Sequence, residues 1–194
     1  MTGEMPPQGV LTATGFAARE AIAMLRKHNI ATAPLLLRAG LSEHGLARAA
    51  ADGNVPLRVS ATGQCKFLEY VAEAMDDSAF GLRLAGKIDP RDVGMYFYAS
   101  SAARDLGEAL ALFSRYCRIV NEAFRLTQRS ADSAIVFEYV GPAKICGRHN
   151  MEYVVARHCG GITNDVRPQT RPSESRVRTQ PEFRRAGIRG ALAA

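Results

Sequence analysis

Residues 106–120 (LGEALALFSRYCRIV) and 121–140 (NEAFRLTQRSADSAIVFEYV) carry the pattern that decides the fold. In the first stretch apolar residues recur at i, i+3, i+4, i+7, i+10, i+11 and i+14, which predicts an amphipathic helix of about four turns with one continuous buried face. That face consists of Leu106, Ala109, Leu110, Phe113, Tyr116, Cys117 and Val120. In the second stretch, 124–128 and 134–140 are short and rich in β-branched and aromatic residues. The polar segment 130–133 lies between them, so we predict an antiparallel hairpin.

The chain ahead of this stretch has helical patterning. Thr14 is placed to cap a helix over 16–28. Pro34 in a first turn and Gly40 as a stop predict a short helix between them. Ser60 is placed to cap a longer helix. The predicted buried face of that helix consists of Cys65, Leu68, Ala72 and Met75.

Two further signals complete the predicted fold. The polar residues 76–78 break the helix that Ser60 begins, and a short helical segment follows them up to Gly86. After the hairpin, Asn150 is placed to cap a last helix that ends near His158 and is closed by the glycines at 160–161. No alternation of strands with helices is present, so the predicted class is α+β: a helix-rich N-terminal part followed by an antiparallel hairpin and a final helix.

The overall composition is that of a soluble globular protein. Of the 194 residues, 47% are hydrophobic and 23% are charged, which suits one domain with or without a tail. No apolar run approaches the ~18 residues that a membrane-spanning helix needs. The first thirty residues lack a basic segment followed by an apolar one, so we expect no secretory signal and a cytoplasmic protein.

The positive charge is concentrated at the C-terminal end. The formal net charge is +6, and residues 166–194 contribute +5 of it through seven arginines and two glutamates, which leaves +1 for residues 1–165. Arginines without a periodic apolar face predict a solvated, disordered tail. The alternative is an electrostatic footprint for nucleic acid.

The cysteines and histidines are the next candidates for chemistry. Cys146 and His149 lie close in sequence to the adjacent His158 and Cys159, but their spacing matches no zinc finger or ribbon. The other two cysteines, Cys65 and Cys117, occupy predicted buried faces, which indicates inert core thiols. No catalytic motif or phosphate-binding glycine loop is present. We therefore expect no metal, no cofactor and no enzymatic activity, with a small cysteine-dependent enzyme as an alternative.

One aromatic cluster, Met95-Tyr96-Phe97-Tyr98, could form part of a ligand pocket. Tyrosine offers a wide apolar surface with a polar tip, and small-molecule pockets have mostly apolar walls with a few polar groups. The alternative is that these side chains pack as one face of a core helix.

An ordered set of short motifs resembles a known family. The motifs are Val55-Pro56-Leu57, Phe80-Gly81-Leu82-Arg83-Leu84-Ala85, Asp92-Val93-Gly94-Met95-Tyr96, Ser100-Ser101, Leu106-Gly107-Glu108-Ala109-Leu110 and Tyr116. Over about 34–168, in this order and with similar gaps, the chain resembles the N-terminal effector-binding, arabinose-binding-type domain of AraC-type transcriptional regulators. The resemblance implies a domain that senses a small molecule and helps the protein to dimerise. It also implies that a separate domain with helix-turn-helix motifs reads the DNA.

A division of the chain and a set of pocket residues are predicted in the light of this resemblance. We expect a disordered start at 1–12, the effector-binding and dimerisation domain at 13–168, and a disordered basic tail at 169–194. The tail holds no pair of helix-turn-helix units, so we expect a truncated or out-of-register form of a longer regulator. The predicted partners are a small-molecule effector and a second copy or a full-length relative, with no membrane contact. The predicted pocket residues are Arg83, Tyr96, Tyr98 and Tyr116. A basic-tailed nucleic-acid-binding protein remains an alternative.

Overall fold

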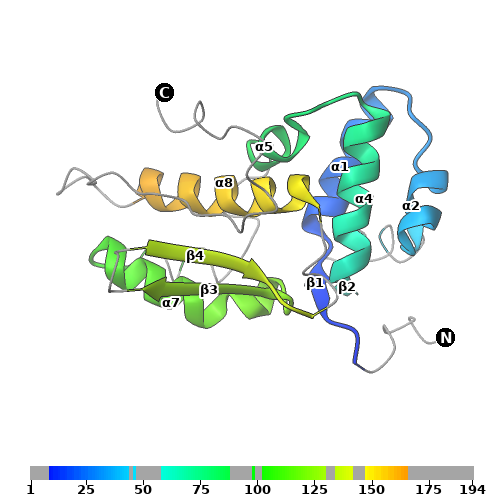
Figure 1. Ribbon diagram of the computed structural model, residues 1–194. Helices are drawn as coiled ribbons and strands as arrows, with labels where there is room; N and C mark the ends of the chain where they lie inside the picture. Colours follow the sequence, from blue (N-terminus) through cyan, green and yellow to red (C-terminus); the bar gives the residue numbers. More distant parts are fainter. Residues whose placement is uncertain are drawn as a thin grey trace.

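The computed structural model describes residues 9–43, 46, 58–87, 98, 102–129, 134–141 and 147–165. One group of elements consists of β1 (Thr12–Thr14), α1 (Phe16–Lys27), α2 (Ala33–Ala39), β2 (Arg58–Ser60), α4 (Ala61–Ala74) and α5 (Phe80–Ala85). A second group consists of α7 (Leu106–Val120), β3 (Phe124–Arg129) and β4 (Ala134–Tyr139). Helix α8 (Arg148–Asp165) runs beside the hairpin and directs its first turn at α4 (Figure 1). The predicted α+β class, with a helix-rich start, a hairpin and a later helix, is confirmed.

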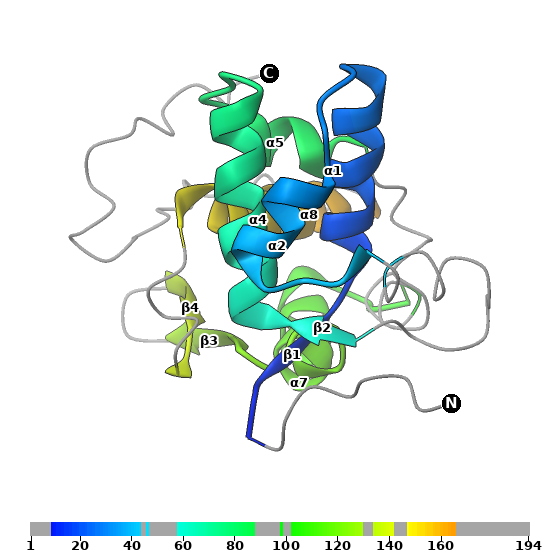
Figure 2. The ribbon, with the colours of Figure 1, turned by 90° about the vertical axis from the view of Figure 1, so that its right-hand side faces the viewer.

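Helix α4 is the centre of the first group. Helices α1 and α2 pack against it, and Figure 2 shows the three together above the short β1–β2 pair. The fully buried side chains of this core include Leu25, Leu36, Phe67, Leu68, Val71, Phe80 and Leu84. Burying each such side chain stabilises the fold by about 1.5–3 kcal/mol. Local sequence signals, namely apolar spacing together with cap, proline and glycine positions, predicted the helices that supply most of these residues.

The start of α1 differs from the prediction. The N-cap residue is Gly15, and no side chain caps the helix. Thr14 ends β1 instead, where it pairs with Arg58 of β2 in an antiparallel register. The prediction that Thr14 caps the helix is therefore wrong, because Thr14 belongs to a strand that pairs with β2, which is distant in sequence. The predicted helix itself is present one residue shorter, as Phe16–Lys27.

Three other local signals act as predicted. Gly40 ends α2 in the left-handed region with φ 70°, which glycine adopts without steric cost. The Ser60 hydroxyl caps α4 by accepting the N–H of Gly63 at 3.1 Å. The break after α4 is built on Asp77, whose carboxylate accepts the N–H of Ala79 at 2.8 Å.

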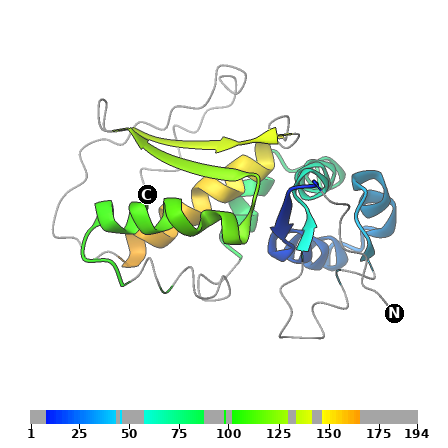
Figure 3. The same cartoon turned by 90° about the horizontal axis from the view of Figure 1, so that it is seen from below.

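The predicted amphipathic helix over 106–120 is present as α7. Asp105 caps it by accepting the N–H of Glu108 at 2.8 Å. The buried face contains Ala109, Leu110, Phe113 and Cys117. Tyr116 and Val120 are only half-buried, so they lie at the border of that face rather than within it. In Figure 3, which views the molecule from below, α7 runs alongside the hairpin, where it packs against β3.

The hairpin forms as predicted, in a register that runs from Phe124 opposite Tyr139 to Arg129 opposite Ala134. Its inner face carries Phe124, which stacks edge-on against Phe113 of α7 at a centroid distance of 6.2 Å. The Ser114 hydroxyl of α7 donates to the Leu126 carbonyl at 2.7 Å and fixes the helix on the strand. The predicted turn at 130–133 lies outside the described residues.

Strand β1 joins the two groups of elements. The Glu122 N–H donates to the Thr12 carbonyl at 2.8 Å, and the Thr12 N–H donates to the Glu122 carboxylate at 2.7 Å. Arg58 of β2 adds a hydrogen bond from its guanidinium to the Ile119 carbonyl at 2.7 Å. The N-terminal strands thus hold the end of α7 against the helical group.

Both predicted ends of the last helix are wrong. The helix begins at Arg148, and Asn150 lies inside it, completely buried. Tertiary hydrogen bonds occupy the Asn150 amide, so it does not serve as a cap. The helix also continues past His158 and the glycines at 160–161 to Asp165. Glycine permits a helix to stop but does not force it, and each interior glycine costs only about 1 kcal/mol.

Candidate functional site

The first turns of α8 bring polar side chains to two places. One lies in the interior, between α4 and the hairpin. The other lies where α8 packs against α5 and the segment that precedes it. Buried polar and charged groups are costly unless they are paired, so each cluster must be held by specific partners.

The interior cluster is a chain of hydrogen bonds across four elements. The Asn150 amide of α8 donates to the Tyr139 hydroxyl of β4 at 2.6 Å and to the Cys65 sulfur of α4 at 2.8 Å. Asn121, which follows α7, donates to the same Tyr139 hydroxyl at 3.3 Å. Its own amide oxygen accepts the Ala123 N–H at 3.0 Å. These side chains are all buried, and they tie the hairpin to both α8 and α7.

Two buried amide oxygens at or beside the interior cluster have no hydrogen-bond partner within the described part of the chain. They belong to Asn150, which is completely buried, and to Gln64, which is 4% exposed. A buried acceptor without a donor costs about 1–3 kcal/mol. A small polar molecule or a bound water with N–H or O–H groups could remove that cost.

The second cluster is built of ion pairs and lies at the α5–α8 contact. Asp77, with its side chain only 3% exposed, pairs with Arg83 of α5. The guanidinium of Arg148 donates to the Ser78 carbonyl at 2.8 Å and also pairs with Glu152 one turn further along α8. These contacts connect the loop after α4, helix α5 and the start of α8.

Glu152 is a buried carboxylate of this second cluster. Burial raises the pKa of Glu152, but hydrogen bonds from His149 and Arg148, together with their positive charge, outweigh burial and lower the pKa below its usual 4.5. The Nδ1 atom of the His149 ring lies 3.4 Å from the Glu152 carboxylate. The backbone N–H of His149 donates to the Glu69 carboxylate of α4 at 2.7 Å. Glu152 is therefore ionised near neutral pH.

The predicted pocket residues occupy different parts of the molecule. Arg83 lies on α5, which sits above α8 in Figure 1, whereas Tyr116 lies on α7, below α8. Arg83 keeps 57% of its side chain exposed beside the buried Asp77. Tyr116 is half-buried, with the Arg115 guanidinium 5.4 Å from its ring centroid. Tyr98 is 57% exposed. Tyr96 lies outside the described residues, so any meeting of the four remains a prediction.

Two of the cysteines are core thiols, as predicted. Cys65 is completely buried and Cys117 is 3% exposed. Burial raises the pKa of the Cys117 thiol, which lowers its reactivity. Cys146 and the side chain of Cys159 lie outside the described part of the chain. Within the described residues, no group of three His, Cys, Asp or Glu side chains could hold a metal ion.

Sequence reasoning missed most members of the two clusters. The sequence pattern predicts a helix cap at Asn150 and a strand position at Tyr139, and it does not distinguish Asn121 or Glu152. The available signal was a polar residue inside an otherwise buried pattern, since buried asparagine and glutamate require partners. Residues 76–78 break the helix as predicted, but the pairing of Asp77 with Arg83 is not reported by the sequence pattern.

The chain matches a known protein family. Residues 30–188 match the family described as the arabinose-binding domain of AraC transcription regulators, N-terminal. The chain belongs to this family. No curated protein matched the chain in a separate comparison.

The AraC-type match covers the chain from just before α2 through α8, and it reaches beyond the point near 168 where the sequence resemblance was expected to end. Both polar clusters therefore fall within the AraC-type domain. Among the described helices, none has the length and hydropathy that crossing a bilayer requires.

Proposed function

We propose that this chain is the small-molecule-sensing and dimerisation domain of an AraC-type transcription regulator. The observation that carries the proposal is the family match over residues 30–188. The domain binds an effector in the cytoplasm, acts as a homodimer or pairs with a full-length relative, and relies on a separate helix-turn-helix domain to bind DNA. It performs no catalysis.

The proposed effector-binding residues are Arg83, Tyr96, Tyr98 and Tyr116, of which Arg83 on α5 and Tyr116 on α7 contribute from opposite sides of α8. Arg83 is the one charged member, and its carboxylate partner Asp77 lies on the buried side of α5. The guanidinium has five N–H donors, so those not directed at Asp77 can bind an anionic or hydroxyl-rich effector from solution. Tyr98 and Tyr116 offer partly exposed ring surface and a hydroxyl.

The interior cluster around Asn150 gives a route by which ligand binding near α5 would affect the hairpin. Helix α8 contacts α5, which carries Arg83, and its Asn150 side chain holds the hairpin through Tyr139. A ligand that shifts α5 would therefore act on α8 and, through the buried hydrogen bonds, on the hairpin. Coupling of this kind requires the ligand to bind one arrangement more tightly than another.

Ligand binding is the direct test. Thermal unfolding would be measured with three probes of different chemistry: L-arabinose as a neutral pentose, succinate as a dicarboxylate and L-glutamate as an amino acid. A ligand at about 100 times its dissociation constant stabilises the folded state by about 2.7 kcal/mol, so a binding probe raises the Tm measurably. Arg83→Gln should abolish the shift for an anionic probe, whereas Arg26→Gln, a change at an exposed site on α1, should not.

Two results would contradict the proposal. One is the absence of any shift with all three probes, at concentrations that saturate millimolar sites, combined with a monomeric chain in sedimentation. The other is equal loss of the shift in the Arg83 and Arg26 variants, because this would show that binding does not depend on the proposed site.

A further inference from the structure

The outer edge of β4 carries backbone groups that the hairpin itself does not use. The Val140 N–H donates to the Ala123 carbonyl at 2.8 Å, so every second residue counted back from Val140 points its backbone groups toward β3. The residues between them, which include Ile135 and Phe137, point theirs away from β3. Among the described residues, no hydrogen bond is made to the backbone N–H or carbonyl of these two.

The outer edge of β3, by contrast, is covered by α7. The Ser114 hydroxyl donates to the Leu126 carbonyl at 2.7 Å, and the Cys117 thiol donates to the Phe124 carbonyl at 3.7 Å. In Figure 3 no described helix or strand lies beyond β4 on its outer side. Residues 134–140 (AIVFEYV) contain one charged residue and no proline, so the edge lacks the features that keep other strands from pairing with it.

The position of α8 indicates which segment can reach this edge. Asn150, in the first turn of α8, bonds Tyr139 at the end of β4, and Val154 is buried in the same core cluster as Tyr139. From there α8 runs back along the hairpin, so its C-terminal end lies at the same end of the molecule as the start of β4 (Figures 1 and 3). A strand that followed α8 would therefore run parallel to β4, with α8 as the crossover that parallel strands require.

We propose that residues 173–180 (SESRVRTQ) add to the outer edge of β4 as a parallel strand. Pro172 and Pro181 bound this stretch, and no proline interrupts it, so every residue within it has the N–H that a strand needs. The connecting residues 166–172 can span about 23 Å, which exceeds the roughly 10 Å between stacked layers. The chain is thus long enough to pass from the end of α8 to the start of β4.

The side chains of this stretch have the alternation of a strand. Val177 and Thr179 are β-branched and share one face, whereas Arg176 and Arg178 share the other. With Val177 beside Phe137, the β-branched face continues the apolar side of the hairpin. The basic face then lies on the outer side of the sheet.

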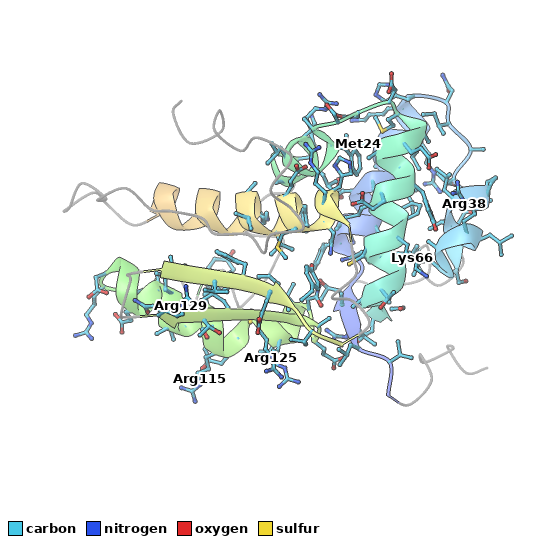
Figure 4. The ribbon with its side chains drawn as sticks, viewed as in Figure 1. Met24, Arg38, Lys66, Arg115, Arg125 and Arg129 are labelled. Atoms are coloured by element: carbon cyan, nitrogen blue, oxygen red, sulfur yellow. The ribbon has the colours of Figure 1, made fainter. Side chains whose placement is uncertain are left out.

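Charge favours this segment over a second copy of β4. Glu138 is the one charged residue of β4, and the same register places Arg178 beside it. Arg125 is paired with Glu138 across the hairpin, but no ion pair joins them among the described side chains, and Figure 4 shows Arg125 projecting to the lower side of the molecule. A second β4 contains no basic residue and could not neutralise Glu138.

Amide hydrogen exchange of the full chain, followed by NMR, tests the proposal. The N–H groups of Ile135 and Phe137 should exchange slowly, as does that of Val136, which points to β3. Val177→Pro removes an N–H and interrupts the added strand. It should speed exchange at Ile135 and Phe137 by about tenfold or more and leave Val136 unchanged. Ala191→Pro, outside the stretch, is the matched control and should change none of the three.

A charge exchange tests the register. Arg178→Glu should also speed exchange at the β4 edge, and adding Glu138→Arg to the same chain should restore protection; a double variant that fails to recover would overturn the placement of Arg178 beside Glu138.

Two results would overturn the proposal as a whole. Fast exchange of Ile135 and Phe137 in the wild-type chain would show that residues 173–180 remain in solvent. Slow exchange that Val177→Pro leaves unchanged would show that another segment or a second copy covers the edge. The inference does not depend on the effector, so neither result bears on the proposed sensing function.

Discussion

Tyr139 is the side chain through which the hairpin is tied to its two neighbouring helices. Its hydroxyl accepts the amide N–H groups of Asn150 at 2.6 Å and of Asn121 at 3.3 Å, and all three residues are buried. Deleting this acceptor removes one hydrogen bond from each buried asparagine amide, and only Asn150 keeps a second one, to Cys65, while the ring itself is retained. The hydrogen bonds, rather than the packing of the ring, are therefore what a phenylalanine would remove.

We predict that Tyr139→Phe lowers the free energy of unfolding by about 1–3 kcal/mol. Urea unfolding followed by circular dichroism measures the change. Tyr116→Phe is the control, because that hydroxyl lies on a half-buried side chain of α7 and should contribute within about 0.5 kcal/mol. Equal effects of the two substitutions would show that the buried hydroxyl has no special role.

At the scale of elements, the contact of α5 with α8 depends on the absence of a side chain at Gly81. A Cβ built there would lie 2.2 Å from the His149 carbonyl oxygen and 2.9 Å from the Glu152 Cβ. Both distances are shorter than real atoms allow, and one neighbour is backbone. The two helices could accept a methyl group only by moving apart, which would strain the Asp77–Arg83 and Arg148–Glu152 pairs beside them.

Gly81→Ala should therefore destabilise the fold by about 1–3 kcal/mol. Gly86→Ala provides the comparison, since its nearest neighbour to a new Cβ is the Arg83 carbonyl oxygen at 3.6 Å, an ordinary contact. We expect that variant to stay within about 0.5 kcal/mol of the wild type in the same unfolding measurement. If Gly81→Ala were as stable as the wild type, α5 would not pack as closely against α8 as described.

The whole molecule should respond to acid through carboxylates that bridge its elements. Folding lowers the pKa of Glu152 below 4.5, with burial outweighed by hydrogen bonds from His149 and Arg148, and it also lowers the pKa of Glu122 through hydrogen bonds from Thr12. The unfolded chain then binds protons more readily than the folded one. The stabilisation is therefore complete above pH 4.5 and is lost as the pH falls through the lower folded-state values.

We predict that the free energy of unfolding declines below pH 4.5 and that Glu152→Gln makes this decline shallower. The measurement is urea unfolding at a series of pH values from neutral to well below pH 4.5. Glu73→Gln serves as the matched change, because that side chain is 71% exposed. Parallel pH profiles for the wild type and Glu152→Gln would contradict the assignment.

Much of the fold could be predicted from local pattern. The amphipathic helix α7, the hairpin, the stop at Gly40 and the cap at Ser60 follow from short-range spacing and from side chains that bond to their own backbone. These signals act within one or two turns, so no knowledge of distant partners is needed. The ordered motifs also indicated the AraC-type family, which the match over residues 30–188 confirms.

The tertiary structure alone decided which residues meet. Thr14 and Asn150 have the chemistry of helix caps, yet one pairs in a strand with Arg58 and the other bonds Tyr139 and Cys65 across the interior. Gly81 is placed against α8 by packing between helices. The physical reason is one of range. A side chain's type and its local spacing fix what it can bond, but only the folded chain decides which of the competing partners lies within reach.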